Sequence, residues 1–261
     1  MYVIKYLKSV RNFGDKDRIV VPLGDTHIGS KGFAEDAFMR TLEFCDKNRD
    51  RASIIIMGDL LEAAHKGSVG KGVYDESMTV REQLNWVYTQ LKDFANMIDV
   101  GVTGNHEERI PNISSLEPLE MLFQRMGIEE RFAMYQGVVE YQVGSQIYTG
   151  FVWHGASGSS TAGGTLNAMW KMRDLVLANF YVMGHTHRIM DDMTYLTVPD
   201  PETQSFRKMP QIFINTGSYL RANGTYAEKA GFKPNYVGTP LLNLSASEKQ
   251  MHVDKTTLVT V

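Results

Sequence analysis

Cysteine and long apolar runs are nearly absent from this 261-residue chain. Cys45 is the single cysteine, which excludes an intramolecular disulfide. No stretch is long and apolar enough to span a bilayer, and residues 1–14 lack the continuous apolar core of a secretory signal. We therefore expect a cytoplasmic protein with no membrane partner.

A strong charge of one sign is also missing. The chain has 27 basic and 30 acidic residues and a formal charge of -3, so no global basic field indicates a nucleic-acid partner. A local patch or bound cations could still provide one. With 43% hydrophobic residues the chain can bury a substantial core, and we expect one domain over residues 1–261.

Short β-branched runs that end at a glycine recur along the chain. The runs are residues 18–23, 52–57, 98–102 and 180–183, and the glycines that follow them are Gly24, Gly58, Gly104 and Gly184. The runs predict buried strands, and the glycines predict sharp turns at their ends. Each turn carries polar residues that could bind a metal ion or transfer a proton.

Segments with helical periodicity separate these runs. Helices are expected at residues 33–49, 76–97, 117–126 and 166–177, and a hairpin at residues 138–143 and 146–153. The alternation predicts an α/β protein whose strand ends meet along one rim, where ligands gather in such folds. Residues 155–165 are rich in glycine and serine, and we expect them to form a mobile loop beside the site.

Five of the seven histidines follow the short strands or their glycine turns. They are His27, His106, His154, His185 and His187, whereas His65 and His252 lie outside the pattern. A single Asp or His at a strand end is more often a turn or surface residue. Chance placement does not explain five of them well.

The histidines, together with the acidic and amide side chains in the same glycine turns, suit divalent metal ions. Carboxylate, amide and imidazole groups without thiolates favour Mn, Fe, Zn or Mg over a structural cysteine–zinc site. Seven such groups are too many for one ion, whereas two ions bridged by a carboxylate would use them and could activate a water beside a phosphoryl group. Residues 67–72 lack the spacing of a phosphate-binding P-loop, and residues 155–160 lack the G-x-S-x-G spacing of a serine hydrolase.

The ordered motifs resemble those of the calcineurin-like metallophosphoesterases. They are Asp25-x-His27, Gly58-Asp59, Gly104-Asn105-His106-Glu107, His154 and Gly184-His185-x-His187, with Asn215-Thr216-Gly217-Ser218 resembling a turn that commonly follows. The resemblance implies a four-layer α/β/β/α sandwich with the active site at the C-terminal ends of strands. None of the metal-ligand positions is replaced.

The resemblance also implies a role for each matching residue. One metal would be held by Asp25, His27, Asp59 and His187, and the other by Asp59, Asn105, His154 and His185. Asp59 would bridge the two ions, with Mn as the first choice and Fe, Zn, Ni or Mg as alternatives. A metal-bridging hydroxide would attack phosphorus in line, and His106 would protonate the leaving oxygen as general acid. Glu107 and Glu108 are either hydrogen-bond partners of the ligands or solvated acids.

The substrate is a phosphoester that the motifs do not identify further. Asp25-Thr26-His27-Ile28-Gly29 and Gly58-Asp59-Leu60-Leu61-Glu62 resemble motifs of DNA double-strand-break repair nucleases, which favours a phosphodiesterase or nuclease acting on a nucleic acid or nucleotide. Candidate substrate contacts are His65, Lys66 and Arg109, and a single-strand surface is suggested by Tyr219, Arg221, Tyr226, Lys229, Phe232, Lys233 and Tyr236. A phosphomonoesterase is the alternative, and a non-catalytic scaffold of the same fold is a third interpretation.

Overall fold

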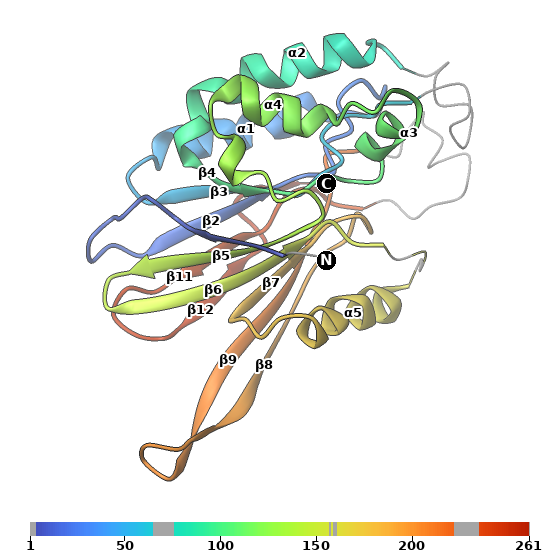
Figure 1. Ribbon diagram of the computed structural model, residues 1–261. Coiled ribbons are helices and arrows are strands. Elements are labelled where there is room, and N and C mark those ends of the chain that lie inside the picture. The colour runs from blue at the N-terminus through green and yellow to red at the C-terminus, as the bar shows by residue number, and fades with distance from the viewer. Residues whose placement is uncertain (1–3, 65–75, 157, 159–160, 222–234, 261) are drawn as a thin grey trace.

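A computed structural model describes residues 4–64, 76–156, 158, 161–221 and 235–260, apart from the side chain of Ile113. Its centre is a pair of β-sheets (Figure 1). The five-stranded sheet has the order β12-β11-β2-β3-β4, and its strands are β2 (Arg18–Leu23), β3 (Ala52–Ile56), β4 (Ile98–Gly101), β11 (Leu241–Leu244) and β12 (Met251–Asp254). Strands β2, β3 and β4 run parallel, so their C-terminal ends lie at one edge of the sheet.

The second sheet has six strands in the order β1-β5-β6-β7-β9-β8. They are β1 (Lys5–Lys8), β5 (Gln136–Val143), β6 (Gln146–Trp153), β7 (Phe180–Met183), β8 (Ile189–Asp200) and β9 (Ser205–Thr216). Strands β6, β7 and β9 are parallel, and β5 forms the expected antiparallel hairpin with β6. A short ladder joins β10 (Val237–Gly238) to β13 (Val259–Thr260).

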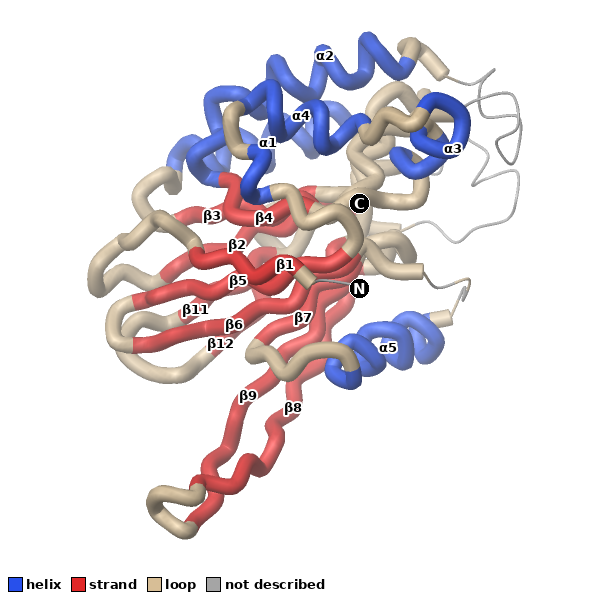
Figure 2. The backbone as a smooth tube through the Cα atoms, in the orientation of Figure 1, coloured by secondary structure: helices blue, strands red, loops and turns tan. Residues whose placement is uncertain are grey.

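Helices cover the outer faces of the two sheets (Figure 2). Helices α1 (Glu35–Lys47), α2 (Val80–Leu91) and α4 (Pro118–Met126) lie over the five-stranded sheet, and α5 (Ala162–Lys171) lies over the six-stranded sheet. Alternate residues of β3 show the layering, because Ile54 and Ile56 pack towards the helices and Ile55 packs between the sheets. The predicted four-layer α/β/β/α architecture is confirmed.

Two sequence predictions about the helices need correction. The helix expected over residues 76–97 is α2 followed by a 3-10 turn, Lys92–Met97, and α2 begins after the capping box of Thr79 and Glu82. The helix expected at residues 166–177 begins earlier, at Ala162, and ends at Lys171. The Thr161 side chain accepts a hydrogen bond from the Gly164 N–H, and this cap allows the glycine-rich residues after it to start a helix instead of a loop.

The long hairpin of β8 and β9 extends beyond the rest of the sheet (Figure 1). Only residues 212–215 of β9 pair with β7, so the distal part of the hairpin is a two-stranded ribbon. Among the described residues, no helix is long and apolar enough to cross a membrane.

Candidate metal centre

The candidate site is formed where the C-terminal ends of strands from both sheets meet. Asp25 and His27 follow β2, Asp59 follows β3, and Asn105 and His106 follow β4 in the five-stranded sheet. His154 follows β6, and His185 and His187 follow β7 in the six-stranded sheet. The structure therefore brings all eight side chains together at one edge of the sandwich, although the rim belongs to two sheets and not to one.

Five of these residues adopt a backbone conformation that is unfavourable for side chains other than glycine. The φ angles are 48° for Asp25, 49° for His27, 48° for Asp59, 67° for His185 and 54° for His187. Left-handed backbone costs about 1–2 kcal/mol per L-residue and persists where the surrounding structure enforces it, often at functional sites. This clustering indicates that the loops are shaped to direct side chains inward.

The glycines of the repeated pattern allow the loops to pack backbone against backbone. A Cβ atom on Gly58 would lie 2.5 Å from the Gly104 nitrogen, and one on Gly104 would lie 2.1 Å from Asp59 Oδ1. A Cβ atom on Gly184 would lie 2.4 Å from Asp25 Oδ2. Each glycine is therefore required because the neighbouring loop occupies the space of a side chain.

One group of candidate ligands contains Asp25, His27 and His187. His187 Nε2 lies 3.2 Å from Asp25 Oδ1 and 3.1 Å from His27 Nε2. His27 Nδ1 lies 3.0 Å from the Glu62 carboxylate, so Nδ1 carries the hydrogen and the Nε2 lone pair of the neutral ring points towards the group. Burial alone would lower the pKa of His27, but Glu62, Asp59 and Asp25 together raise it.

The second group contains Asp59, Asn105, His154 and His185. His154 Nε2 lies 3.3 Å from Asp59 Oδ2 and 3.2 Å from Asn105 Oδ1, and His185 Nδ1 lies 2.8 Å from the same amide oxygen. His154 Nδ1 lies 2.7 Å from the Met57 carbonyl oxygen, which can only accept a hydrogen bond, so Nδ1 is the protonated nitrogen. The lone pair of Nε2 therefore faces two oxygen acceptors.

Such a convergence of acceptors requires a cation. In the protein alone a proton fills this role: burial lowers the pKa of His154, but the Asp59 carboxylate outweighs it and raises the pKa to about 10. A divalent metal ion fits the same donor set of carboxylate, amide and imidazole groups. Asp59 Oδ2 lies 3.9 Å from His27 Nε2 and 3.3 Å from His154 Nε2, so one carboxylate oxygen lies between the two groups.

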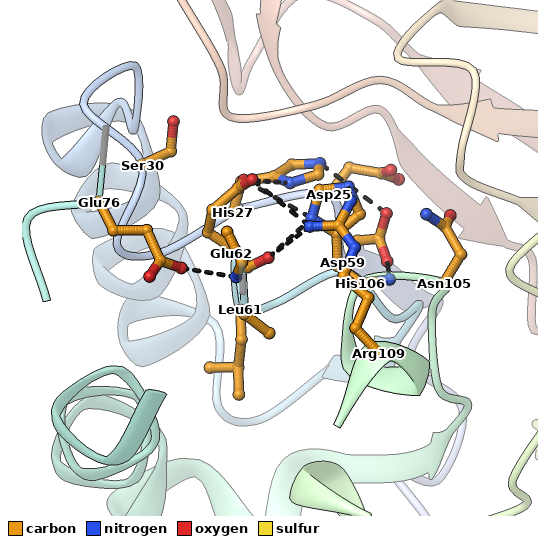
Figure 3. Close-up of polar contacts among 12 residues, drawn as sticks. Asp25, His27, Ser30, Asp59, Leu61, Glu62, Glu76, Asn105, His106 and Arg109 are labelled. Carbon is orange, nitrogen blue, oxygen red and sulfur yellow. Dashed lines mark hydrogen bonds and ion pairs between the residues drawn. The ribbon is translucent and has the colours of Figure 1, made fainter. Parts of the chain in front are cut away.

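Two glutamates, Glu107 and Glu62, hold the loops that carry these ligands, and Figure 3 shows Glu62 beside His27. Glu107 is buried, and its carboxylate accepts hydrogen bonds from the backbone nitrogens of Asp59 at 2.8 Å, Leu61 at 2.9 Å and Gly104 at 3.1 Å. Burial and the nearby Asp59 raise the pKa of Glu107 to about 7. Of the two alternatives raised by the sequence, Glu107 is thus a hydrogen-bond partner of the site, whereas Glu108 is partly exposed.

Glu62 is the site residue that the sequence analysis did not single out. Its carboxylate orients His27, and its carbonyl oxygen lies 2.9 Å from His106 Nδ1. Orientation of a ligand histidine through its second nitrogen is a common feature of metal sites. The available signal was the position of Glu62 three residues after Asp59, although an acid at a loop end has many ordinary explanations.

His106 differs from the other histidines in the partners of its ring. Nδ1 lies 2.9 Å from the Glu62 carbonyl oxygen, Nε2 lies 2.8 Å from Arg109 Nη2, and the backbone nitrogen donates to Asp59 Oδ1. Burial and the neighbouring His27 lower the pKa of His106 to about 4. The ring lies edge to face with His27, with 4.3 Å between the centroids, so His106 is beside the candidate ligands.

The predicted substrate contacts are only partly described. Arg109 lies in the site, whereas His65 and Lys66 are outside the described residues. Four of the seven residues of the suggested single-strand surface, Tyr226, Lys229, Phe232 and Lys233, are outside them too. Tyr219 was wrongly assigned to that surface, because its ring is buried in the core and its hydroxyl bonds to Thr41 at 2.8 Å. Arg221 pairs with Asp36, and Tyr236 is exposed.

Solved structures with similarity to this chain include three that cover most of its length. Vacuolar protein sorting 29 from Cryptosporidium parvum is 15% identical, the match covers 91% of this chain and 95% of that chain, and the TM-score is 0.45. For a predicted phosphoesterase from Streptococcus pneumoniae the identity is 12%, the coverages are 91% of this chain and 89% of that chain, and the TM-score is 0.38. For a metallophosphoesterase from Sphaerobacter thermophilus the identity is 13%, the coverages are 92% of this chain and 88% of that chain, and the TM-score is 0.36. Similarity this low concerns the fold alone. No protein-family profile and no curated protein matches the sequence.

Proposed function

We propose that the protein is a phosphoester hydrolase that uses two divalent metal ions, with phosphodiesters, including nucleic acids, as the preferred substrate class. The observation that carries the proposal is the convergence of acceptor atoms in two groups, with a carboxylate oxygen of Asp59 between them. Asp25, His27, Asp59 and His187 would hold one ion, and Asp59, Asn105, His154 and His185 the other. The two ions would supply Lewis acidity that polarises a phosphoryl oxygen and stabilises the entering and leaving oxygens.

The protein's own residues would orient the groups and transfer a proton. Glu62 and the Met57 carbonyl oxygen fix the rings of His27 and His154 through Nδ1 and direct Nε2 inward. His106 has its Nδ1 hydrogen bonded to the Glu62 carbonyl oxygen, so Nε2 is the nitrogen that would take up a proton from water and pass it to the leaving oxygen. General acid catalysis contributes about 10² to 10⁴ in rate.

The deciding experiment compares a generic phosphodiester with the corresponding monoester on the Mn-loaded protein, followed by single-stranded and duplex DNA. We expect hydrolysis of the diester, and we expect His106→Ala to retain both metals while losing a factor of at least about 10² in turnover. Asp59→Ala should instead lose metal, which metal analysis of the purified variant measures.

Two results would change the proposal. A strict preference for the monoester would replace the diester assignment with the phosphomonoesterase alternative. Full turnover by metal-saturated His106→Ala would remove His106 from its assigned role, and inertness of the metal-loaded protein towards all of these substrates would favour the scaffold interpretation.

A further inference from the structure

Arg109 occupies a position inside the site that the proposed metal ligands do not explain (Figure 3). It ends the 3-10 turn Glu107–Arg109, directly after the loop of Asn105 and His106. Its Nη2 lies 2.8 Å from His106 Nε2, and its Nη1 donates to the Glu62 carbonyl oxygen at 3.0 Å. The side chain is 22% exposed, so the guanidinium is within reach of a ligand in solution.

The contact with Arg109 determines which nitrogen of His106 carries the hydrogen. A guanidinium has only N–H donors, so His106 Nε2 must be the acceptor. The hydrogen is then on Nδ1, which donates to the Glu62 carbonyl oxygen. In this arrangement neither ring nitrogen can donate to a leaving oxygen. The Nδ1 hydrogen is already bonded to the Glu62 carbonyl oxygen, and Nε2 carries no hydrogen because its lone pair accepts from Arg109.

The partners that hold the Arg109 guanidinium are weak competitors for it. The two atoms within hydrogen-bond distance, a carbonyl oxygen and an imidazole nitrogen, belong to uncharged groups. Among the described residues, the nearest carboxylate oxygen is Glu62 Oε1, 3.7 Å away, while Glu62 Oε2 bonds to His27 at 3.0 Å. A phosphoryl group offers two anionic oxygens to the planar guanidinium, so it adds an ion pair and bidentate geometry that a carbonyl oxygen and an imidazole nitrogen do not supply.

We propose that Arg109 binds the phosphoryl group of the substrate, and that in doing so it moves from His106 Nε2 to the phosphoryl oxygens and uncovers the lone pair of this nitrogen. The proposal rests on the proposed function and deepens it. The lone pair of His106 is covered in the free protein and becomes available when an anion with phosphoryl geometry is present. Arg109 thus couples recognition of the phosphoryl group to the exposure of the His106 Nε2 lone pair.

The test uses inorganic phosphate as the probe and the Zn-loaded full-length protein. Phosphate affinity is measured by calorimetry for the parent protein and for Arg109→Gln, which retains hydrogen-bond donors but loses the charge. We expect a loss of about 10- to 100-fold in affinity, as for removal of a hydrogen bond to a charged group. Arg109→Lys should give an intermediate value because it keeps the charge but not the fork. Arg125→Gln, a change on the outer helix α4, is the matched control and should bind as the parent does.

The second measurement follows the nitrogen resonances of His106 in histidine-labelled protein. In the parent, phosphate should shift the Nε2 resonance as Arg109 leaves, whereas in Arg109→Gln this resonance should start at its released position and move little. Unchanged phosphate affinity in a folded Arg109→Gln, or a His106 resonance that phosphate does not move in the parent, would overturn the proposal. A merely structural role would lower thermal stability without either change.

The two measurements distinguish a failure of this inference from a failure of the proposed function. Both measurements work without turnover, so an inactive protein that still binds phosphate through Arg109 would contradict the hydrolase and not this inference. If the hydrolase is active, Arg109→Gln should raise KM for a substrate with a good leaving group by about the same 10- to 100-fold and change kcat less. A fall in kcat at constant KM would contradict phosphoryl binding by Arg109.

Discussion

At the scale of single residues, the backbone carbonyls around the site decide what each imidazole can do. The Met57 carbonyl holds the Nδ1 hydrogen of His154 and leaves Nε2 facing two oxygen acceptors, whereas the Glu62 carbonyl holds the Nδ1 hydrogen of His106 and leaves Nε2 facing a guanidinium. The Nε2 lone pair of His154 lies among oxygen acceptors and favours a bound cation, whereas the Nε2 lone pair of His106 lies opposite a guanidinium and does not. The same residue type therefore has opposite electrostatic surroundings within one site.

Glu107 should contribute to the stability of the protein because three backbone N–H groups donate to its buried carboxylate. Glu107→Ala would leave the backbone N–H groups of Asp59, Leu61 and Gly104 without their acceptor. Each buried unsatisfied donor costs about 1–3 kcal/mol, so we expect the free energy of unfolding to fall by at least about 3 kcal/mol. Urea unfolding of the metal-free protein measures this change.

The neighbouring acid provides the control for Glu107. Glu108 is partly exposed, and Glu108→Ala should change the free energy of unfolding by less than about 0.5 kcal/mol, as surface substitutions usually do. Glu107→Gln keeps one oxygen acceptor and should give an intermediate loss. Equal effects of the two alanine substitutions would show that the three hydrogen bonds of Glu107 contribute nothing.

The roles of individual residues could be predicted only where a pattern distinguishes them. Glycine turns after apolar runs identified Asp25, Asp59 and His187 as residues that lie together. No pattern distinguishes Glu107 from Glu108, because which of two adjacent acids points inward depends on the path of the turn after β4. The contact of Arg109 with His106 depends on that same turn.

At the scale of the elements, the strand-end loops are packed too closely for any residue but glycine at certain positions. Gly104 does not have a positive φ, so its requirement comes from space alone. A methyl group there would lie 2.1 Å from Asp59 Oδ1 and 2.3 Å from the Asp59 nitrogen, and backbone cannot move aside as a flexible side chain can. The loops after β3 and β4 therefore depend on each other for their shape.

Gly104→Ala should accordingly damage metal binding and stability together. We expect a loss of about 1–3 kcal/mol, the usual range for overpacking, and a metal content well below that of the parent protein. Gly163→Ala on α5 is the matched control, because a Cβ atom there meets nothing within 4 Å. It should raise stability by about 0.5–1 kcal/mol, since alanine is the better helix former. Thermal unfolding and metal analysis test both, and a Gly104→Ala protein with full metal content would contradict the packing argument.

The elements differ in how far sequence could predict them. Residues 18–23, 52–56 and 180–183 were predictable as strands because their apolar runs are short, β-branched and bounded by glycine. The region from Arg188 onward was expected to be mostly β, but the bounds of the twelve-residue strand β8 were not predicted, since neither of its faces is fully buried and its sequence has no continuous apolar run. The start of α5 was missed because its first turn contains two glycines and depends on the Thr161 cap.

At the scale of the whole molecule, both sheets contribute candidate ligands to one site. Asp25, Asp59 and Asn105 belong to loops of the five-stranded sheet, whereas His154, His185 and His187 belong to loops of the six-stranded sheet. Between the sheets lies an apolar layer that includes Val20, Ile55, Val152 and Val182. Local periodicity predicts each strand but not the sheet to which it pairs, so the two sheets could be expected from the motif resemblance and not from the periodicity.

Metal removal should therefore weaken the contact between the sheets and not only the site. Each proposed ion takes ligands from both sheets, so binding to the folded state alone would stabilise the protein by about 2.7 kcal/mol at a metal concentration 100 times Kd. We expect chelation to lower Tm and added Mn to restore it in a concentration-dependent way. Asp59→Asn, which changes the shared carboxylate, should show little response to Mn, whereas Arg125→Gln should respond as the parent does. Backbone hydrogen exchange should show metal-dependent protection in both β4 and β7, and protection confined to one sheet would mean that the ligands of the other sheet do not bind metal.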